Sequence, residues 1–335
     1  MTEESSTTSQ LSVAMTTTGM TQITGENTTI SSSSRSAQFY FLCVAIVIGV
    51  IGTAANALII YALVASKQHK KHALIVNQNA LDLFSSFFMV VTYSLRLCNI
   101  HLTGSVGYWL CALLLSDNLI WLGTVGSCIS LASITVERYL KVVHPAWSQM
   151  KLRNWMIYAA AAFAWIGSFI YNTVTVLLTT VVKDGRCYPY QFWKNGMNPI
   201  VHAMWSFVSF YVIILLIFIL CYWRILIVIR RQARVMASHN HTGPGTSQTI
   251  SNQIQTNVIK TMIFVSAFYA ISWMPHHVYV VYRSLYPNTI GGWIYNALTS
   301  IAFLFTCTNP FVYATKFDPV KQVLLRLILC KKTSE

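Results

Sequence analysis

Charge is scarce in this sequence of 335 residues. Charged residues make up only 10% of it, and Asp and Glu together number nine, whereas about a quarter of the residues in an ordinary soluble domain are charged. Five stretches of more than 20 residues contain no Asp, Glu, Lys or Arg: 39–65, 155–182, 197–223, 261–282 and 293–315. They also lack the separate polar and apolar faces of a helix in a soluble protein. The composition therefore excludes an ordinary soluble protein.

Seven stretches are long and apolar enough to cross a membrane, because about 20 apolar residues span a hydrocarbon core roughly 30 Å thick. Besides the five uncharged stretches, 73–95 carries only Asp82 and 108–136 carries only Asp117. The sequence thus predicts an all-α membrane protein, a seven-transmembrane helix bundle with a short amphipathic eighth helix. The predicted spans lie at about 39–65, 73–97, 108–140, 154–182, 198–230, 255–283 and 291–315.

Lys and Arg are rare on one side of the predicted bundle. The side that receives the C-terminus holds most of the 23 basic residues, whereas the other side holds only Arg35, Arg96, Lys183, Arg186, Lys194 and Arg283. Positive residues stay cytoplasmic during insertion, so we expect a multi-pass plasma-membrane protein with an extracellular N-terminus. The net charge of +14 then reflects topology and contact with anionic membrane lipid, and not binding of nucleic acid.

The two ends of the chain carry candidate modification sites. Residues 1–38 are rich in Ser and Thr, lack an apolar run that could serve as a signal peptide, and are predicted to be disordered. They hold a glycosylation sequon at Asn27, and a second sequon at Asn240 falls in a predicted cytoplasmic loop, where it should stay unmodified. Residues 316–335 are predicted to form the amphipathic eighth helix and a short cytoplasmic tail, in which Cys330 is either palmitoylated or a free thiol.

Two of the eight cysteines are candidates for a disulfide. Cys111 opens the third span and Cys187 lies in the loop after the fourth, both at the outer edge of the bundle, in the oxidising compartment. We predict a bond between them. Cys98 also lies near the outer surface and is the competing partner for Cys187.

Polar side chains lie at similar depth in four spans. Asn56, Asp82, Ser127 and Asn309 are each roughly 10 to 20 Å from the cytoplasmic end of their helix, at about 1.5 Å per residue. They suggest one buried network with Asp82 as its only charge, and a buried carboxylate needs a cation or several donors. Two interpretations stand side by side: a sodium ion held by Asp82, Ser127 and Asn309, or a neutral Asp82 hydrogen-bonded to Asn309. No other cofactor is expected.

The third span places its polar residues on one helical stripe. Residues from Asp117 to Arg138 recur at alternating spacings of three and four, which puts them on one face. The two charged ends of this stripe would be about 32 Å apart on a continuous helix, with Asp117 toward the outer surface and Arg138 toward the cytoplasm. Pro275 and Pro310 interrupt the sixth and seventh spans, where we expect kinks.

Six motifs in order resemble the rhodopsin-like family of G-protein-coupled receptors, and the likeness covers about residues 39–330. The matching residues are Asn56 in the first span, Asp82 in the second, Glu137-Arg138-Tyr139 followed by His144-Pro145 after the third, Trp165 in the fourth, Trp273-Met274-Pro275 in the sixth and Asn309-Pro310-Phe311-Val312-Tyr313 in the seventh.

The resemblance implies a cell-surface receptor, and not an enzyme, with an extracellular ligand, a heterotrimeric G protein and arrestin as partners. Ligand binding would shift an equilibrium between two packings of the bundle, with the sixth helix swinging about Pro275, beside Trp273. Arg138 would pair with Glu137 at rest and turn toward Tyr222 on activation; the alternative is that Arg138 extends to lipid phosphate. The residues assigned to the coupling switch are Glu137, Arg138, Tyr139, Tyr222, Asn309, Pro310 and Tyr313.

Four positions depart from the family pattern. Cys111 lies slightly further ahead of Arg138 than is usual, and Ile214 stands where the fifth helix usually has proline, so no bulge can be assumed there. Gln255 replaces an acid at the start of the sixth helix and cannot form a salt bridge to Arg138, so we expect raised ligand-free activity. Phe305 replaces a polar residue often found near the sodium site, which weakens the interpretation as an ion site.

The ligand is predicted from the outer ends of the spans. Amine receptors of this family carry an Asp where Ile120 stands, and retinal would need a Lys in the seventh span, so neither ligand is expected. A peptide is favoured, with Asp117 meeting a basic residue or an amino terminus. A lipid or small acidic metabolite bound by Arg96 or Arg283 is the alternative. The predicted ligand-binding residues are Asp117, Trp121, Arg96, His202, His276, His277, Tyr279 and Arg283.

Two other classes of membrane protein fit less well. A zinc enzyme would need a spacing such as HExxH, which is absent. An intramembrane aspartyl protease would need two carboxylates at one depth, yet Asp82 and Asp117 lie toward opposite ends of the bilayer. A transporter, the other alternative, predicts internal repeats with broken helices, and no repeat is found.

Overall fold

The computed structural model describes residues 36–98, 100–191, 198–239, 246–286, 292–316 and 318–328. Within these ranges it leaves out the side chains of residues 233, 235–239, 246–258, 261, 292, 313, 315–319, 327 and 328. Several predictions therefore lie outside the described parts: the sequons at Asn27 and Asn240, the side chains of Gln255 and Tyr313, and Cys330.

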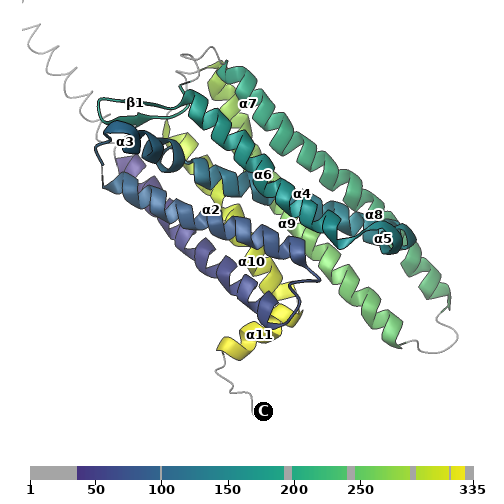
Figure 1. Ribbon diagram of the computed structural model, residues 1–335. Helices are drawn as coiled ribbons and strands as arrows, with labels where there is room; N and C mark the ends of the chain where they lie inside the picture. Colours follow the sequence, from purple (N-terminus) through teal and green to yellow (C-terminus); the bar gives the residue numbers. More distant parts are fainter. Residues whose placement is uncertain are drawn as a thin grey trace, which may run out of the picture.

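Long helices lying side by side make up most of the described chain, and the short helix α11 turns away at one end of the bundle (Figure 1). The elements are a first helix Ser36–Ala65, α2 Ala73–Leu97, α3 Gly104–Leu110, the π-helix η1 Cys111–Leu115, α4 Asn118–Val143, α5 Pro145–Lys151, α6 Asn154–Thr179, β1 Val181–Lys183, β2 Arg186–Tyr188, α7 Pro199–Phe207, the π-helix η3 Val208–Val212, α8 Ile213–His239, α9 Thr246–Leu285, α10 Gly292–Lys316 and α11 Asp318–Ile328. Among the described residues, five continuous helical stretches are long and apolar enough to cross a membrane: Ser36–Ala65, Ala73–Leu97, Gly104–Val143, Asn154–Thr179 and Pro199–Gln232.

The third predicted span is bent and not one straight α-helix. After α3 the chain forms the π-helical turn η1, and Asp117 then adopts a left-handed backbone with φ 61° and ψ 15° before α4 begins. A left-handed residue other than glycine interrupts a right-handed helix, so the N-terminal part of the stretch Gly104–Val143 is not a regular α-helix. The predicted span 108–140 lies within this stretch. From Ile120 onward the predicted stripe is confirmed: Ile120, Thr124, Ser127, Leu131 and Ile134 are fully buried.

The fifth span contains a π-helical turn although it lacks the proline that is usual in the family that the sequence resembles. The turn η3 ends two residues before Ile214, between α7 and α8. A π turn leaves a carbonyl without its α-helical partner, and here the hydroxyl of Tyr269 on α9 donates to the carbonyl of Phe210. Tyr211 in turn donates to the carbonyl of Ala270, at 3.1 Å. Two reciprocal tyrosine contacts therefore stabilise the widened turn.

A two-stranded hairpin replaces the predicted end of the fourth span. Helix α6 ends at Thr179 instead of continuing to 182, and β1 pairs antiparallel with β2 so that Val182 faces Cys187. The β-branched run from Thr179 to Val182 favours strand over helix. Asp184 and Gly185 form the turn with φ of 51° and 69°, as a two-residue hairpin turn requires.

Helices α2 and α4 approach closely because glycine lies at their contact. A Cβ added to Gly123 would lie 2.8 Å from both the carbonyl oxygen of Leu81 and the Cβ of Ser85. In contrast, a Cβ added to Gly167 on α6 would meet only the ring of Phe163, at 3.7 Å. The backbone of α2 thus leaves no room for a side chain at position 123.

We expect Gly123→Ala to destabilise the protein and Gly167→Ala to leave its stability unchanged or higher. Overpacking against backbone atoms costs about 1–3 kcal/mol, whereas alanine in a helix is favoured over glycine by about 1 kcal/mol where space permits. The measurement is the thermal midpoint of the purified protein. A midpoint for Gly123→Ala at or above that of Gly167→Ala would contradict the close contact.

Candidate functional site

A cavity of about 1500 Å³ lies between the helices at the end of the bundle that carries the hairpin. Side chains from the first helix, α2, α4, α6, α7, α9 and α10 line it. Seven of the eight predicted ligand-binding residues contribute to the walls: Arg96, Trp121, His202, His276, His277, Tyr279 and Arg283. Their contact with a ligand stays a prediction, but the structure brings them to one cavity.

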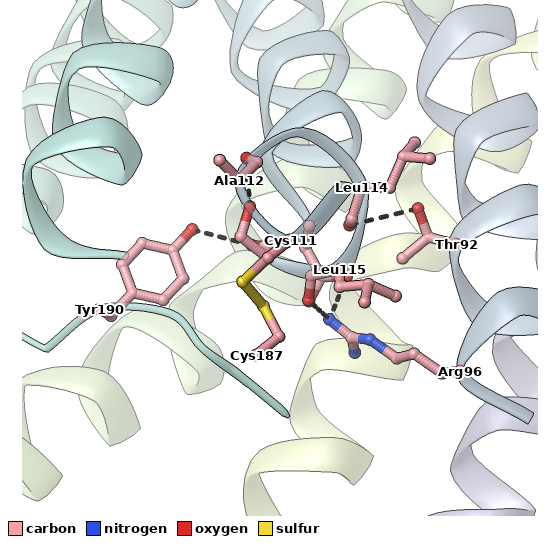
Figure 2. The surroundings of a disulfide bond; sticks show 10 residues. Thr92, Arg96, Cys111, Ala112, Leu114, Leu115, Cys187 and Tyr190 are labelled. Atoms are coloured by element: carbon pink, nitrogen blue, oxygen red, sulfur yellow. Dashed lines mark hydrogen bonds and ion pairs between the residues drawn. A yellow bond between two sulfur atoms is a disulfide. The ribbon is translucent and has the colours of Figure 1, made fainter. Parts of the chain in front are cut away.

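Asp117 is the predicted ligand-binding residue that does not line this cavity. Its carboxylate forms an ion pair with the guanidinium of Arg96, with 2.8 Å between Oδ1 and Nη2. The guanidinium also donates to the carbonyl of Leu115 (Figure 2). It lies 5.1 Å from the centre of the Tyr93 ring. The left-handed backbone at Asp117 makes this possible, because it turns the carboxylate toward α2. Asp117 is thus paired with a residue of the cavity lining, and its contact with a ligand stays a prediction.

The disulfide joins Cys111 and Cys187 and confirms the predicted pairing, while Cys98 is free and exposed. It ties β2 to the π-helical turn η1 (Figure 2). The π turn and the break after it accommodate the unusual spacing between Cys111 and Arg138, because a π turn holds one more residue than an α turn.

Tyr190 follows the disulfide and caps the break in the third span. Its hydroxyl donates to the carbonyl of Ser116, at 3.3 Å. Burial, followed by the nearby Asp117 carboxylate, raises the pKa of Tyr190 above its usual range, so the phenol remains protonated and able to donate. The loop thus supplies a hydrogen bond that the interrupted helix lacks.

The floor of the cavity is aromatic. The rings of Trp121 on α4 and Trp273 on α9 are 6.0 Å apart between centroids, in an edge-to-face arrangement, which is a favourable geometry. Trp121 also packs against Phe303 on α10, and Trp273 against Tyr269. A ligand that moves one of these rings would therefore alter the packing of α4, α9 and α10 together.

At the opposite end of the bundle, the predicted ion pair between Glu137 and Arg138 does not form. Glu137 pairs with Lys141 instead. Adjacent residues on a helix point in different directions, whereas residues four apart lie on one face. The structure thus corrects this expectation on simple helical geometry.

Arg138 contacts His72, a histidine at the start of α2. Its Nη2 lies 3.3 Å from Nδ1 of His72, the residue before α2. Burial, and to a smaller extent the positive charge of Arg138, lowers the pKa of His72 to about 3. The imidazole is therefore neutral near pH 7, and its ring nitrogen can accept from the guanidinium.

Tyr222 links three helices near Arg138. Its hydroxyl lies 3.1 Å from that of Thr135 on α4 and 3.1 Å from that of Ser266 on α9. Ser266 lies seven residues before Trp273, about 10 Å along the same helix. One helix, α9, thus contributes both to the cavity floor and to the polar contact at the other end.

Comparison with known proteins agrees with this arrangement. Residues 55–313 match the family described as "7 transmembrane receptor (rhodopsin family)". The chain belongs to this family. Such proteins are multi-pass receptors of the plasma membrane that signal and are not enzymes.

Relatives of the receptor include proteins named for peptide ligands. It is 22% identical over 298 residues to the galanin receptor type 1 of Rattus norvegicus, covering 85% of this chain and 81% of the relative. It is 24% identical over 280 residues to the tachykinin-like peptides receptor 99D of Drosophila melanogaster, covering 79% of this chain and 52% of the relative. It is also 22% identical over 220 residues to the adenosine receptor A2a of Canis lupus familiaris, covering 61% of this chain and 52% of the relative.

The predicted polar network lies in the middle of the receptor. Asn56, Asp82, Ser127 and Asn309 are fully buried, and Asn309 donates to Oδ2 of Asp82 at 2.7 Å. Within the described residues, Oδ1 of Asp82, Oγ of Ser127 and Oδ1 of Asn309 have no hydrogen-bond partner. Three buried oxygens without donors fit the ligand set of a hard cation, although Phe305 is buried among aromatic rings and supplies no oxygen. The sodium ion stays a prediction.

Sequence reasoning missed several side chains of the receptor's site. Tyr190, Tyr269 and Tyr295 line the cavity, and His72 contacts Arg138. Only Tyr190 carried a usable signal, because it lies three residues after the disulfide cysteine of the same loop. The other three occupy positions where an aromatic or loop residue has no distinguishing pattern.

Proposed function

We propose that this receptor binds a peptide at the hairpin end of the bundle and activates a heterotrimeric G protein at the other end. The names of two relatives, which refer to galanin and to tachykinin-like peptides, support the ligand class. The size of the cavity supports it as well. At about 1500 Å³ it exceeds the roughly 300–1,000 Å³ of sites for small molecules.

The observation that carries the proposal is the position of α9. Trp273 lies on the cavity floor, and Ser266 on the same helix bonds to Tyr222. A ligand that displaces Trp273 and swings α9 about Pro275 would break the bond between Ser266 and Tyr222. The hydroxyl of Tyr222 would then be available to Arg138, at the surface where a G protein would bind. In this proposal the N-terminus is extracellular, so the hairpin end faces outward.

The resting state is held by the contact between Arg138 and His72. A hydrogen bond to a charged group contributes about 1.5–3 kcal/mol, and only a contact that differs between the two states shifts their populations. Because His72 is a neutral acceptor, this contact lacks the attraction of an ion pair. The prediction of raised ligand-free activity therefore has two grounds: Arg138 contacts a neutral residue, and Gln255 cannot form a salt bridge to Arg138.

We expect His72→Leu to raise ligand-free nucleotide exchange about three- to tenfold over the parent receptor. The change removes the acceptor that holds Arg138 at rest, so the active packing becomes more populated. The measurement is GTPγS binding to reconstituted G proteins on membranes with matched receptor levels. His69→Leu is the matched control, since His69 lies in the same loop and no contact with Arg138 is seen there among the described residues.

Two further results bear on the coupling proposal. Arg138→Ala should lower exchange to the level of membranes without receptor. If the parent receptor and His72→Leu both remain at that level with every class of G protein, the proposed coupling is wrong.

A further inference from the structure

The cavity lining holds two guanidinium groups. Among the described residues, the lining includes the guanidinium groups of Arg96 and Arg283 and three histidines, and it includes no Asp or Glu. The nearest carboxylate, Asp117, is held by Arg96 outside the lining. A ligand group that enters this cavity therefore meets two guanidinium groups, one of which, that of Arg96, is paired with Asp117.

Donors from three helices line the cavity. Nη1 of Arg283 lies 3.5 Å from the hydroxyl of Tyr279, and both residues are on α9. The ring of Tyr279 is 6.0 Å from that of Tyr295 on α10, and Arg96 on α2 lines the same cavity. We call Arg96, Tyr279, Arg283 and Tyr295 the donor wall. A guanidinium and phenol hydroxyls together form the donor set that binds a carboxylate strongly.

The donor wall continues directly into the aromatic floor. His276 bridges them, since its ring is 5.7 Å from Tyr295 on one side and 5.5 Å from Trp121 on the other. Trp121 and Trp273 complete the floor. Trp273 and Arg283 are ten residues apart on α9, about 15 Å along the helix, so an elongated ligand can place an aromatic or aliphatic group on the floor while its carboxylate reaches the wall.

We propose that the ligand of this receptor is an apolar carboxylate, in which an aromatic or aliphatic group packs on Trp121 and Trp273 and the anionic group binds the donor wall through Arg283. This inference rests on the proposed function and narrows it: the peptide has an apolar C-terminal segment that ends in a free carboxylate, and not in an amide. The same chemistry could be supplied by a small aromatic acid or a fatty acid.

The experiment uses the full-length receptor purified into nanodiscs of neutral lipid. The probes are short peptides that end in Phe, Trp or Leu, each synthesised once as the free acid and once as the C-terminal amide. A separate arm uses phenylpropionate and dodecanoate. Binding is measured as a rise in the thermal midpoint, and signalling is measured separately as nucleotide exchange on reconstituted G protein.

We expect free-acid peptides to raise the midpoint and their amides not to do so at the same concentration. Arg283→Gln should weaken binding of the acids about tenfold or more, and Arg283→Lys should restore part of it, because a charge-assisted contact is lost and then partly replaced. Arg186→Gln is the matched control, since it removes the same charge from an exposed strand residue that does not line the cavity. Equal midpoints of the variants without probe show that folding is intact.

The outcomes separate this inference from the proposed function. Amides that bind as well as acids, acids that do not bind at all, or an Arg283→Gln variant that binds acids normally would each overturn the inference. Activation by amides would at the same time support the proposed peptide receptor. Binding of small or fatty acids alone would support the carboxylate site and contradict the peptide ligand. Binding of acids without nucleotide exchange would support the site and contradict the coupling.

Discussion

The Asp117→Ala variant is expected to be less stable than the parent receptor by about 2 to 3 kcal/mol. Removing one partner of a buried ion pair costs about 3–5 kcal/mol, and we take a smaller value because the side chains of Arg96 and Asp117 are 25% and 20% exposed. The loss arises because Arg96 is left without its counter-charge. The measurement is the thermal midpoint of the purified receptor without ligand.

Two variants make this result specific. The double variant Arg96→Gln, Asp117→Asn removes both charges together, so it should be more stable than Asp117→Ala alone. Asp184→Asn removes a carboxylate from the exposed hairpin turn, where the left-handed backbone also suits asparagine, and its midpoint should match the parent. A midpoint for Asp117→Ala equal to that of Asp184→Asn would show that the ion pair contributes nothing.

Loss of the disulfide should have an effect of similar size. Cys111 and Cys187 are 76 residues apart, and closing a loop of that length stabilises a folded chain by up to about 4 kcal/mol in the chain-entropy view. We expect about 2 to 4 kcal/mol for Cys187→Ser, since helices that persist in the membrane after unfolding already restrict the chain. The thermal midpoint under non-reducing conditions measures this loss.

Cys98→Ser is the matched control for this prediction. Cys98 lies near the same end of the bundle and is free and exposed, so its replacement should leave the midpoint within experimental error of the parent. Mass spectrometry after alkylation should find Cys98 modified and the peptides of Cys111 and Cys187 linked. A lower midpoint for Cys98→Ser than for Cys187→Ser would mean that the other pairing forms in the folded receptor.

The parts of this fold that follow from composition and regular periodicity were predictable from the sequence. The buried stripe of α4 follows from spacings of three and four, and Cys187 finds Cys111 because both lie beside the same end of the bundle. Seven of the eight predicted ligand-binding residues line one cavity, because polar and aromatic groups at the ends of apolar spans face the interior more often than lipid.

The remaining features depend on local backbone geometry that has no sequence signature. The residues around Asp117 have no pattern that predicts a left-handed backbone. The prediction assumed a straight helix, which would direct the carboxylate into the cavity, whereas in the structure the carboxylate contacts Arg96. Helical geometry alone should have excluded the pair of Glu137 and Arg138. Arg138 and His72, which are in contact, are 66 residues apart in the sequence. Helical spacing rules predict contacts only between residues a few positions apart, so they could not predict this one.

The two π-helical turns have a consequence for how receptors of this kind diversify. An extra residue in a helix rotates everything before it by roughly 100° relative to everything after it. Both η1 and η3 lie toward the hairpin end of their helices, ahead of the segments that hold Tyr222 and Arg138. Insertion or deletion of a single residue at either turn can thus rotate the side chains at the hairpin end while the register of the helix around Tyr222 or Arg138 stays unchanged. With two such π-helical turns, receptors of this kind could evolve to bind new ligands through insertions or deletions of single residues, while the residues around Tyr222 and Arg138 stay unchanged.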